Sequence, residues 1–224
     1  MYWVLKMIVL GPLVRWFARP QVVGSLPDGP VVLAPNHLAE IDSLVLCVAL
    51  PRRLTFVAKS EYFARGGAAA WLYGTLCRLT GQVPISRGGG GSADAALDAA
   101  AGILRRGGVW AIYPEGTRSP DGRLYRGRTG VARVALATQC AVVPVGVTGT
   151  RSVDPPGRRG WRRGRVEIRL GQPLDLSRWS ARPADPAGWR AATDELMSAI
   201  QRLSGQRYVD RHATDAERAA RDAA

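Results

Sequence analysis

The sequence contains few of the side chains that usually bind transition metals. Its two histidines are His37 and His212, and its three cysteines, Cys47, Cys77 and Cys140, are far apart in apolar surroundings. A structural zinc site uses about four ligands, mostly Cys and His, and no two cysteines have C-x-x-C spacing. We therefore expect no metal site, and we expect the cysteines to be reduced, buried thiols in a cytosolic setting.

A long hydrophobic segment is also missing. Residues 1–18 (MYWVLKMIVLGPLVRWFA) are mostly apolar, but Lys6, Arg15 and the pair Gly11-Pro12 interrupt them. A membrane-spanning helix needs about 20 apolar residues, and no small-residue cleavage site indicates a signal peptide. We expect a helix in the membrane headgroup region, with basic residues reaching toward water. Its interfacial anchors would be Trp3, Trp16 and Phe17. The alternative is a helix that packs onto the domain, and both can hold.

Acidic residues are scarce relative to basic ones. The chain has 18 Asp and Glu against 31 Lys and Arg, a net charge of +13. Such a protein attracts nucleic acid, anionic lipid headgroups or phosphorylated metabolites, and charge alone does not choose among them. The segment G-R-R-G-W-R-R-G-R at 157–165 could bind nucleic acid, with Trp161 stacking on a base. No recognised nucleic-acid motif accompanies it, so we expect an anionic membrane surface and no nucleic acid as partner.

What is present indicates one α/β domain. The 224 residues are 46% hydrophobic, enough for a sizeable core. Apolar, β-branched segments alternate with helical ones, which predicts a mixed, mostly parallel central sheet flanked by helices. The strands are expected at 31–34, 54–58, 109–113, 142–147 and 165–170, and the helices at 44–50, 68–80, 92–106 and 129–140.

Three parts of the chain differ in composition. Residues 1–20 would form the amphipathic interfacial helix, and residues 21–204 the catalytic domain. Residues 205–224 are rich in Ala, Arg and Asp, with almost no large apolar side chains. This polar tail is expected to be a frayed helix or disordered, because it has too little apolar surface to bury.

The first motif with chemical content is N-H-L-A-E-I-D, in which His37 precedes Asp42 by five positions. Histidine has the pKa of a general base near neutrality. A nearby carboxylate can hold one ring nitrogen and stabilise the imidazolium. The base could deprotonate a substrate hydroxyl directly, without a Ser or Cys nucleophile. Alone, the motif is also compatible with a helix-capping Asp and a surface His.

Three further motifs follow. Y-P-E-G-T-R-S at 113–119 comes directly after a predicted strand and offers donors to a phosphate, although it could be a turn with a local ion pair. G-Q-V-P-I-S-R at 81–87 ends a short apolar run with an arginine. V-V-P-V-G at 142–146 is by itself only a core strand.

In their order and spacing these four motifs closely resemble those of the glycerolipid acyltransferase family, over about residues 30–150. That family includes 1-acylglycerol-3-phosphate and glycerol-3-phosphate acyltransferases. The resemblance implies transfer of a fatty acyl group from acyl-CoA or acyl-ACP to the free hydroxyl of 1-acylglycerol-3-phosphate, giving phosphatidic acid. The thioester is a cosubstrate, and no other cofactor is expected. Glycerol-3-phosphate, a lyso-ornithine lipid or a glycolipid stay open as acceptors. The expected location is the cytoplasmic face of the cell membrane, peripheral or monotopic.

The resemblance also assigns residues. His37 is implied as the general base and Asp42 as its orienting partner. Acceptor binding is assigned to Glu115, Gly116, Thr117 and Arg118, with phosphate contacts from Arg118 and Arg87. Lys59 falls where similar proteins carry a lysine near the acceptor phosphate, and it could equally be a solvated charge. Pro144 matches the motif that shapes the acyl-binding region. Ser86 departs from the family, which often has an acidic residue or Asn there, and this leaves the acceptor preference open.

Overall fold

The structure is a computed structural model. It describes residue 3 and residues 5–59, 83–85, 92–158, 160–179 and 185–216, and for a few of these the backbone only. The predicted helix at 68–80, the predicted phosphate contact Arg87 and the thiol of Cys77 lie outside the described residues.

Within the described residues, a seven-stranded sheet forms the centre of the fold, in the order β1-β8-β7-β2-β5-β3-β4. All neighbouring strands are parallel except β7 and β8, which are antiparallel. The prediction of a mixed, mostly parallel sheet is therefore confirmed. In chain order the strands are β1 (Pro20–Val23), β2 (Val31–Pro35), β3 (Leu54–Lys59), β4 (Val83–Ile85), β5 (Val109–Ala111), β7 (Val142–Thr148) and β8 (Val166–Leu170).

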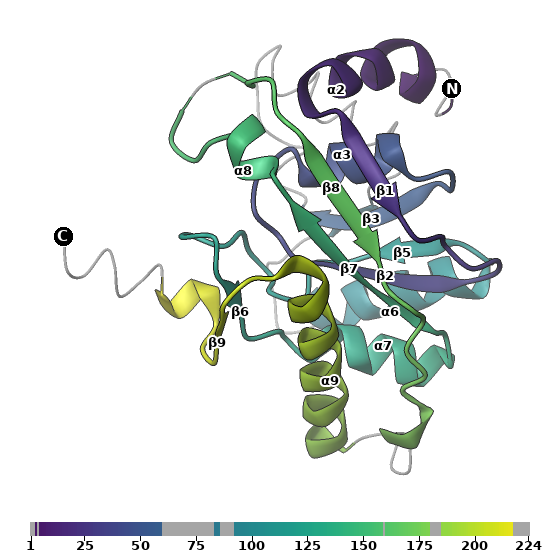
Figure 1. The fold of residues 1–224 in the computed structure, drawn as a ribbon. Helices are drawn as coiled ribbons and strands as arrows, with labels where there is room; N and C mark the ends of the chain where they lie inside the picture. The colour runs from purple at the N-terminus through teal and green to yellow at the C-terminus, as the bar shows by residue number, and fades with distance from the viewer. Residues whose placement is uncertain are drawn as a thin grey trace.

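Helices cover both faces of this sheet (Figure 1). Side chains of β2 alternate between the two layers, as expected for a central strand buried on both sides. Val31 and Leu33 belong to one apolar cluster, and Val32 and Ala34 belong to the other. The first cluster includes α2 (Gly11–Ala18), α3 (Asp42–Ala49) and α8 (Thr150–Val153). The second includes α6 (Ser92–Arg105), α7 (Gly130–Thr138) and α9 (Pro186–Ser204), with the short η2 (Ser177–Trp179) beside it.

Strand β2 lies between β5 and β7, and this arrangement locates the site. The chain order reverses there, and parallel α/β sheets form a crevice at the carboxyl ends of the strands at such a point. The motif with His37 follows β2 directly, and the motif 113–119 follows β5. The topology thus brings the first two motifs to one edge.

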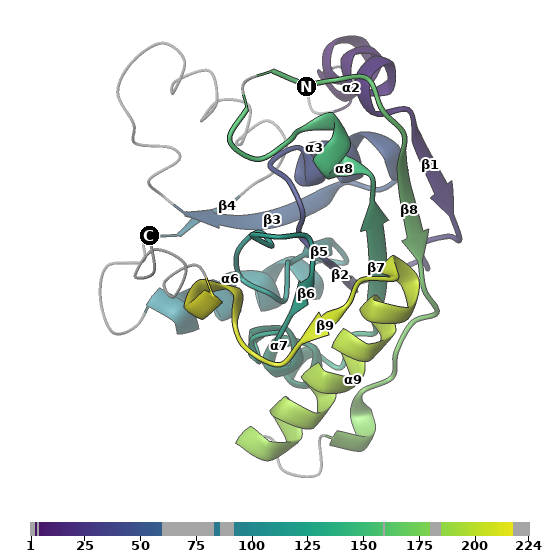
Figure 2. The ribbon, with the colours of Figure 1, turned by 60° about the vertical axis from the view of Figure 1, so that its left-hand side comes forward.

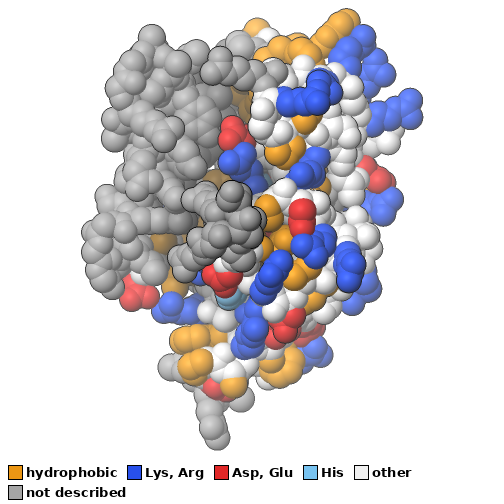
Figure 3. Space-filling model, turned by 90° about the vertical axis from the view of Figure 1, so that its left-hand side faces the viewer, with side chains coloured by type: hydrophobic (Ala, Val, Ile, Leu, Met, Phe, Trp, Pro, Cys, Tyr) orange, Lys and Arg blue, Asp and Glu red, His pale blue; other side chains and the backbone are white. Residues whose placement is uncertain are grey.

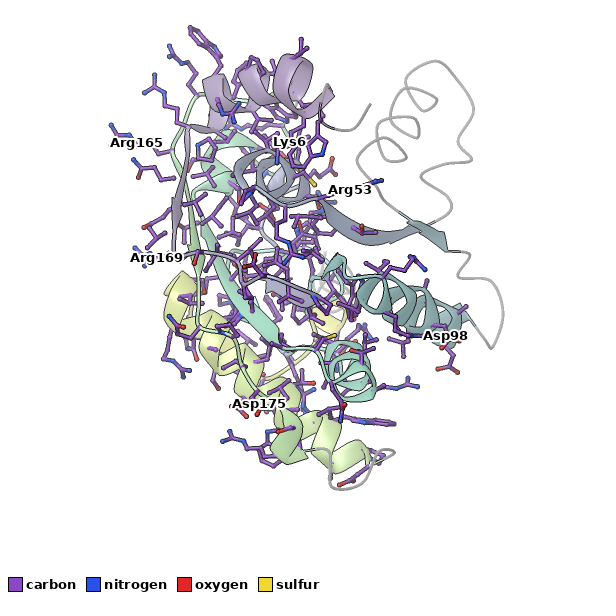
Figure 4. All side chains as sticks on the ribbon, turned by 90° about the vertical axis from the view of Figure 1, so that its right-hand side faces the viewer. Lys6, Arg53, Asp98, Arg165, Arg169 and Asp175 are labelled. Carbon is purple, nitrogen blue, oxygen red and sulfur yellow. The ribbon has the colours of Figure 1, made fainter. Side chains whose placement is uncertain are left out.

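The N-terminal segment is helical and packs onto the domain. It consists of a π-helix, η1 (Leu5–Leu10), followed by α2. Lys6 was expected to reach toward water, but it lies between this segment and α3 and donates to the carbonyl oxygen of Leu50 (Figure 4). That carbonyl follows the end of α3, where a helix dipole favours a cation, and burial lowers the pKa of Lys6. No helix in the described part of the chain is both long and apolar enough to cross a membrane.

The C-terminal segment is more ordered than its composition suggests. After α9 the chain forms β9 (Tyr208–Val209), which pairs in parallel with β6 (Leu124–Tyr125), as Figure 2 shows. Ala213 and Ala216 are buried against Tyr125. The expectation of a frayed or disordered tail therefore does not hold for residues 205–216, because they pair with β6 through the backbone and pack against Tyr125.

Candidate active site

His37 and Asp42 form a direct pair at the end of β2. His37 Nδ1 lies 2.8 Å from Asp42 Oδ2, and the side chain of His37 is 16% exposed while that of Asp42 is fully buried. This contact occupies one ring nitrogen of His37. Within the described residues no side chain hydrogen-bonds the other, Nε2, so it is the nitrogen that can exchange a proton with a bound hydroxyl.

Asp42 is held by the backbone in front of it. Its Oδ2 also accepts from the backbone N–H of Leu38 at 2.6 Å and of Ala39 at 2.9 Å. Asp42 is the first residue of α3, where a negative charge interacts favourably with the helix dipole. Its buried Oδ1 has no hydrogen-bond partner among the described residues. A buried carboxylate with incomplete hydrogen bonding favours a positive neighbour, and His37 becomes one when it takes up a proton.

Tyr113 fixes the ring plane of His37. The two rings stack with their centroids 3.7 Å apart and an interplanar angle of 11°. The Tyr113 hydroxyl lies 2.7 Å from Ser43 Oγ on α3, and Phe56 stacks near the same ring. Tyr113 belongs to the motif 113–119, but the motif alone predicts no role for it, since the stacking depends on two strand ends that meet only in the fold.

Glu115 connects the two motifs. Its Oε1 accepts from the backbone N–H of His37 at 3.0 Å, and its Oε2 accepts from that of Tyr125 at 2.9 Å. The residue has no exposed surface. Burial raises the pKa of Glu115 to about 7, although both backbone donors lower it, and the nearby charge of Asp42 raises it further. These contacts give Glu115 a positioning role, and its contact with an acceptor stays a prediction.

Gly116 forms the turn of the second motif. Its φ is +77°, a left-handed conformation that glycine adopts without cost, and a Cβ there would lie 2.9 Å from Arg128 Nε. The backbone N–H of Gly116 donates to the carbonyl oxygen of Tyr113 at 3.1 Å. This hydrogen bond stabilises the turn itself.

Arg118 lies at the rim of the site. Its guanidinium donates to Glu40 Oε1 at 2.8 Å, and the two side chains are 50% and 75% exposed. An exposed ion pair of this kind contributes at most about 1 kcal/mol. The guanidinium can therefore exchange Glu40 for a phosphate at little cost. Thr117, beside it, is half-buried.

The other predicted site residues are placed only in part. Lys59 ends β3, where it is in register with Ile85, and its side chain is not described. Pro144 is buried within β7, in register with Ala34, and its carbonyl oxygen accepts from Gly171. That position is in the core of the sheet, and a role for Pro144 in acyl binding stays a prediction. The described residues contain no group of three or more His, Cys, Asp or Glu that could hold a metal ion.

Comparison with known proteins identifies the family of this chain. The sequence profile of the family described as Acyltransferase matches residues 10–148. The chloroplastic 1-acyl-sn-glycerol-3-phosphate acyltransferase LPAT1 of Arabidopsis thaliana is 31% identical over 67% of this chain and 41% of that protein. The 1-acyl-sn-glycerol-3-phosphate acyltransferase alpha of Bos taurus is 27% identical over 76% of this chain and 59% of that protein. This chain thus spans about half the length of these two relatives.

A solved structure has the same fold. It is the 1-acyl-sn-glycerophosphate (LPA) acyltransferase PlsC of Thermotoga maritima, with a TM-score of 0.62 and 24% identity. The likeness covers 88% of this chain and 80% of that chain. The profile match spans more than half of the sequence and includes His37, Asp42 and the motif 113–119. The chain belongs to the acyltransferase family.

Proposed function

We propose that this protein transfers a fatty acyl group from an acyl thioester to the free hydroxyl of 1-acylglycerol-3-phosphate, forming phosphatidic acid. The observation that carries the proposal is the His37–Asp42 pair, at 2.8 Å. It lies at the same edge of the sheet as the exposed guanidinium of Arg118. A base and an anion site together fit an acceptor that carries both a hydroxyl and a phosphate. The names of the relatives support the same acceptor.

The reaction follows from the free ring nitrogen of His37. Nε2 takes the proton of the acceptor hydroxyl. At the same time the hydroxyl oxygen attacks the carbonyl carbon of the thioester, and the new C–O bond forms. Asp42, held by two backbone N–H groups, stabilises the resulting imidazolium. The tetrahedral intermediate then collapses, its C–S bond breaks, and the leaving thiolate takes the proton back from His37. Neither step requires a metal or a covalent enzyme intermediate.

The choice of acceptor and donor can be tested with one set of assays. The purified chain, with acyl-CoA and acyl-ACP supplied separately, is offered 1-acylglycerol-3-phosphate, glycerol-3-phosphate, a lyso-ornithine lipid and a neutral monoacylglycerol. We expect the highest kcat/KM with 1-acylglycerol-3-phosphate, and we expect Arg118→Ala to raise the KM of that acceptor without changing that of the neutral one. Equal rates with the phosphorylated and the neutral lipid would reject the phosphate assignment.

We further propose that the protein works at the cytoplasmic face of an anionic membrane, to which its N-terminal segment attaches. Exposed apolar side chains lie along this segment, and Figure 3 shows hydrophobic and basic side chains next to each other at the top of the molecule. Arg163 lies over the ring of Trp16, at 4.2 Å, and Arg165 points outward near the same helix (Figure 4). Phe17, by contrast, packs against Trp161. The exposed side chains are Trp3, Ile8, Leu13 and Trp16.

Vesicle binding tests this attachment. Trp16→Ser should reduce partition onto phosphatidylglycerol vesicles on the order of 10-fold, since a large apolar side chain contributes about 1.5–3 kcal/mol when it leaves water. The matched control is Val23→Ser, because Val23 is similarly exposed but lies on the edge strand β1. Binding should weaken with salt, and a single-stranded oligonucleotide should not compete. Equal losses in the two variants, or strong competition by the oligonucleotide, would refute the attachment.

A further inference from the structure

Five residues from three separate segments form a closed ring of hydrogen bonds behind His37. Asn36 Nδ2 donates to Gln206 Oε1 at 2.7 Å, and Gln206 Nε2 donates to the carbonyl oxygen of Gly122 at 2.8 Å. The N–H of Gly122 donates to Ser119 Oγ at 2.9 Å, and the N–H of Ser119 donates to the carbonyl oxygen of His37 at 2.8 Å. The peptide bond between Asn36 and His37 closes the ring.

Gln206 provides the partner for one of the two amide N–H donors of Asn36. The side chain of Asn36 is fully buried, and it accepts from the N–H of Val147 at 2.7 Å and donates to the carbonyl oxygen of Val147 at 2.9 Å. An asparagine amide has two N–H donors, and the second is the one that Gln206 accepts. Without it, a buried donor would lack a partner, which costs more than the hydrogen bond itself contributes.

The backbone holds Gln206 in place on both sides. Gly205, at φ +69°, ends α9 and reverses the chain, and its N–H donates to the carbonyl oxygen of Gln201. On the other side, the carbonyl oxygen of Arg207 accepts from the N–H of Leu124 at 3.0 Å, next to the β6–β9 pair (Figure 2). Gln206 therefore reaches the ring from a fixed position.

We propose that Gln206 is a positioning residue that sets the distance between the end of β2, which carries His37, and the loop that carries Glu115 and Arg118. A glutamine suits this place because its amide offers both an acceptor, for Asn36, and a donor, for Gly122. Arg151 supports the same loop by donating to the carbonyl oxygen of Ser119 at 2.9 Å. The expected effect on kcat rests on the proposed acyl transfer. The expected effect on the position of His37 rests on the hydrogen-bond ring alone.

Two substitutions distinguish the acceptor and the donor function of the Gln206 amide. Gln206→Leu removes both bonds, and we expect kcat to fall about 10-fold with the KM of donor and acceptor unchanged, because small displacements of a catalytic group are costly. Gln206→Glu keeps the acceptor but loses the donor, and it should fall between Gln206→Leu and the unaltered chain. Gln139→Leu is the matched control, because Gln139 is exposed and lies before the amino end of β7, at the opposite edge of the sheet. It should leave kcat unchanged.

An NMR measurement keeps the test independent of turnover. The chain has two histidines, so the ring protons of His37 can be assigned by comparison with His37→Ala. We expect their resonances to shift in Gln206→Leu and not in Gln139→Leu. The proposal is overturned if kcat falls less than about 2-fold, if KM rises while kcat is kept, or if the His37 resonances do not move. Should Gln206→Leu fail to fold, the same readouts on Gln206→Glu decide. If the unaltered chain transfers no acyl group, the proposed function fails, and the NMR result alone decides on Gln206.

Discussion

Replacing His37 by alanine should lower the rate of acyl transfer by about 10²–10⁴, the contribution typical of a general base. Among the described residues at this edge of the sheet, His37 alone has a ring nitrogen bound to a buried carboxylate and a second ring nitrogen without a hydrogen bond. The fold should survive, because Asp42 keeps its two backbone donors and the lost side chain is partly exposed. The measurement is release of free thiol from acyl-CoA in the presence of acceptor, together with thermal unfolding of each variant.

Asp42→Asn serves as the companion variant. The asparagine oxygen can still accept from Leu38 and Ala39, so the turn is preserved, but the charge that stabilises the imidazolium is gone. We expect a loss of at least about 10-fold in kcat with little change in KM. A His37→Ala protein that unfolds as the unaltered chain does and retains more than a tenth of its activity would rule out His37 as the base.

The five inner strands of the central sheet could be predicted from the sequence because they are short apolar runs bounded by turn residues, whereas the edge strands β1 and β4 were missed. The strands at 31–34, 54–58, 142–147 and 165–170 all match observed ones to within a residue or so. The longest helix in the described part of the chain, α9, was missed although its ends carry ordinary signals: Asp185 caps it, Pro186 is its first residue and Gly205 ends it. Two-residue strands such as β6 and β9 carry no periodicity, so pairing between distant segments creates them.

The site was predictable where it is local and not where it depends on tertiary contacts. His37 and Asp42 are five residues apart in one turn, so sequence spacing alone brings them within reach. Tyr113 acts on His37 through the alignment of β2 and β5, and Gln206 through the return of the chain after α9. Neither contact has a signature in sequence spacing, because the residues involved lie far apart along the chain.

Glu115 should make the stability of this protein depend on pH in a direction opposite to that of most carboxylates. Burial raises its pKa from 4.5 to about 7, so between these values the folded state holds a proton that the unfolded state has released. The folded state then binds more protons, and stability falls as pH rises. The contribution is fully present below the ordinary pKa and is lost as pH rises through about 7. The contribution of Glu115 to the free energy of unfolding is roughly 3 kcal/mol for a pKa difference of this order.

Glu115→Gln removes the titrating group and tests this dependence. We expect the free energy of unfolding of the unaltered chain, measured by urea denaturation and taken relative to that of Glu115→Gln, to decrease by up to roughly 3 kcal/mol between pH 5 and pH 8. The variant should also be less stable at pH 5, because its NH₂ group cannot accept from one of the two backbone donors, His37 or Tyr125.

Glu40→Gln is the matched control for the loss of a carboxylate next to the same site. Glu40 is 75% exposed, so water solvates its carboxylate in the folded and the unfolded chain alike. Because its ion pair with Arg118 is exposed, the loss of the Glu40 carboxylate should change the free energy of unfolding by at most about 1 kcal/mol at each pH. If the curves for Glu115→Gln and the unaltered chain are parallel from pH 5 to pH 8, Glu115 is ionised throughout. The hydrogen bonds from the two backbone N–H groups would then lower the pKa of Glu115 by as much as burial raises it.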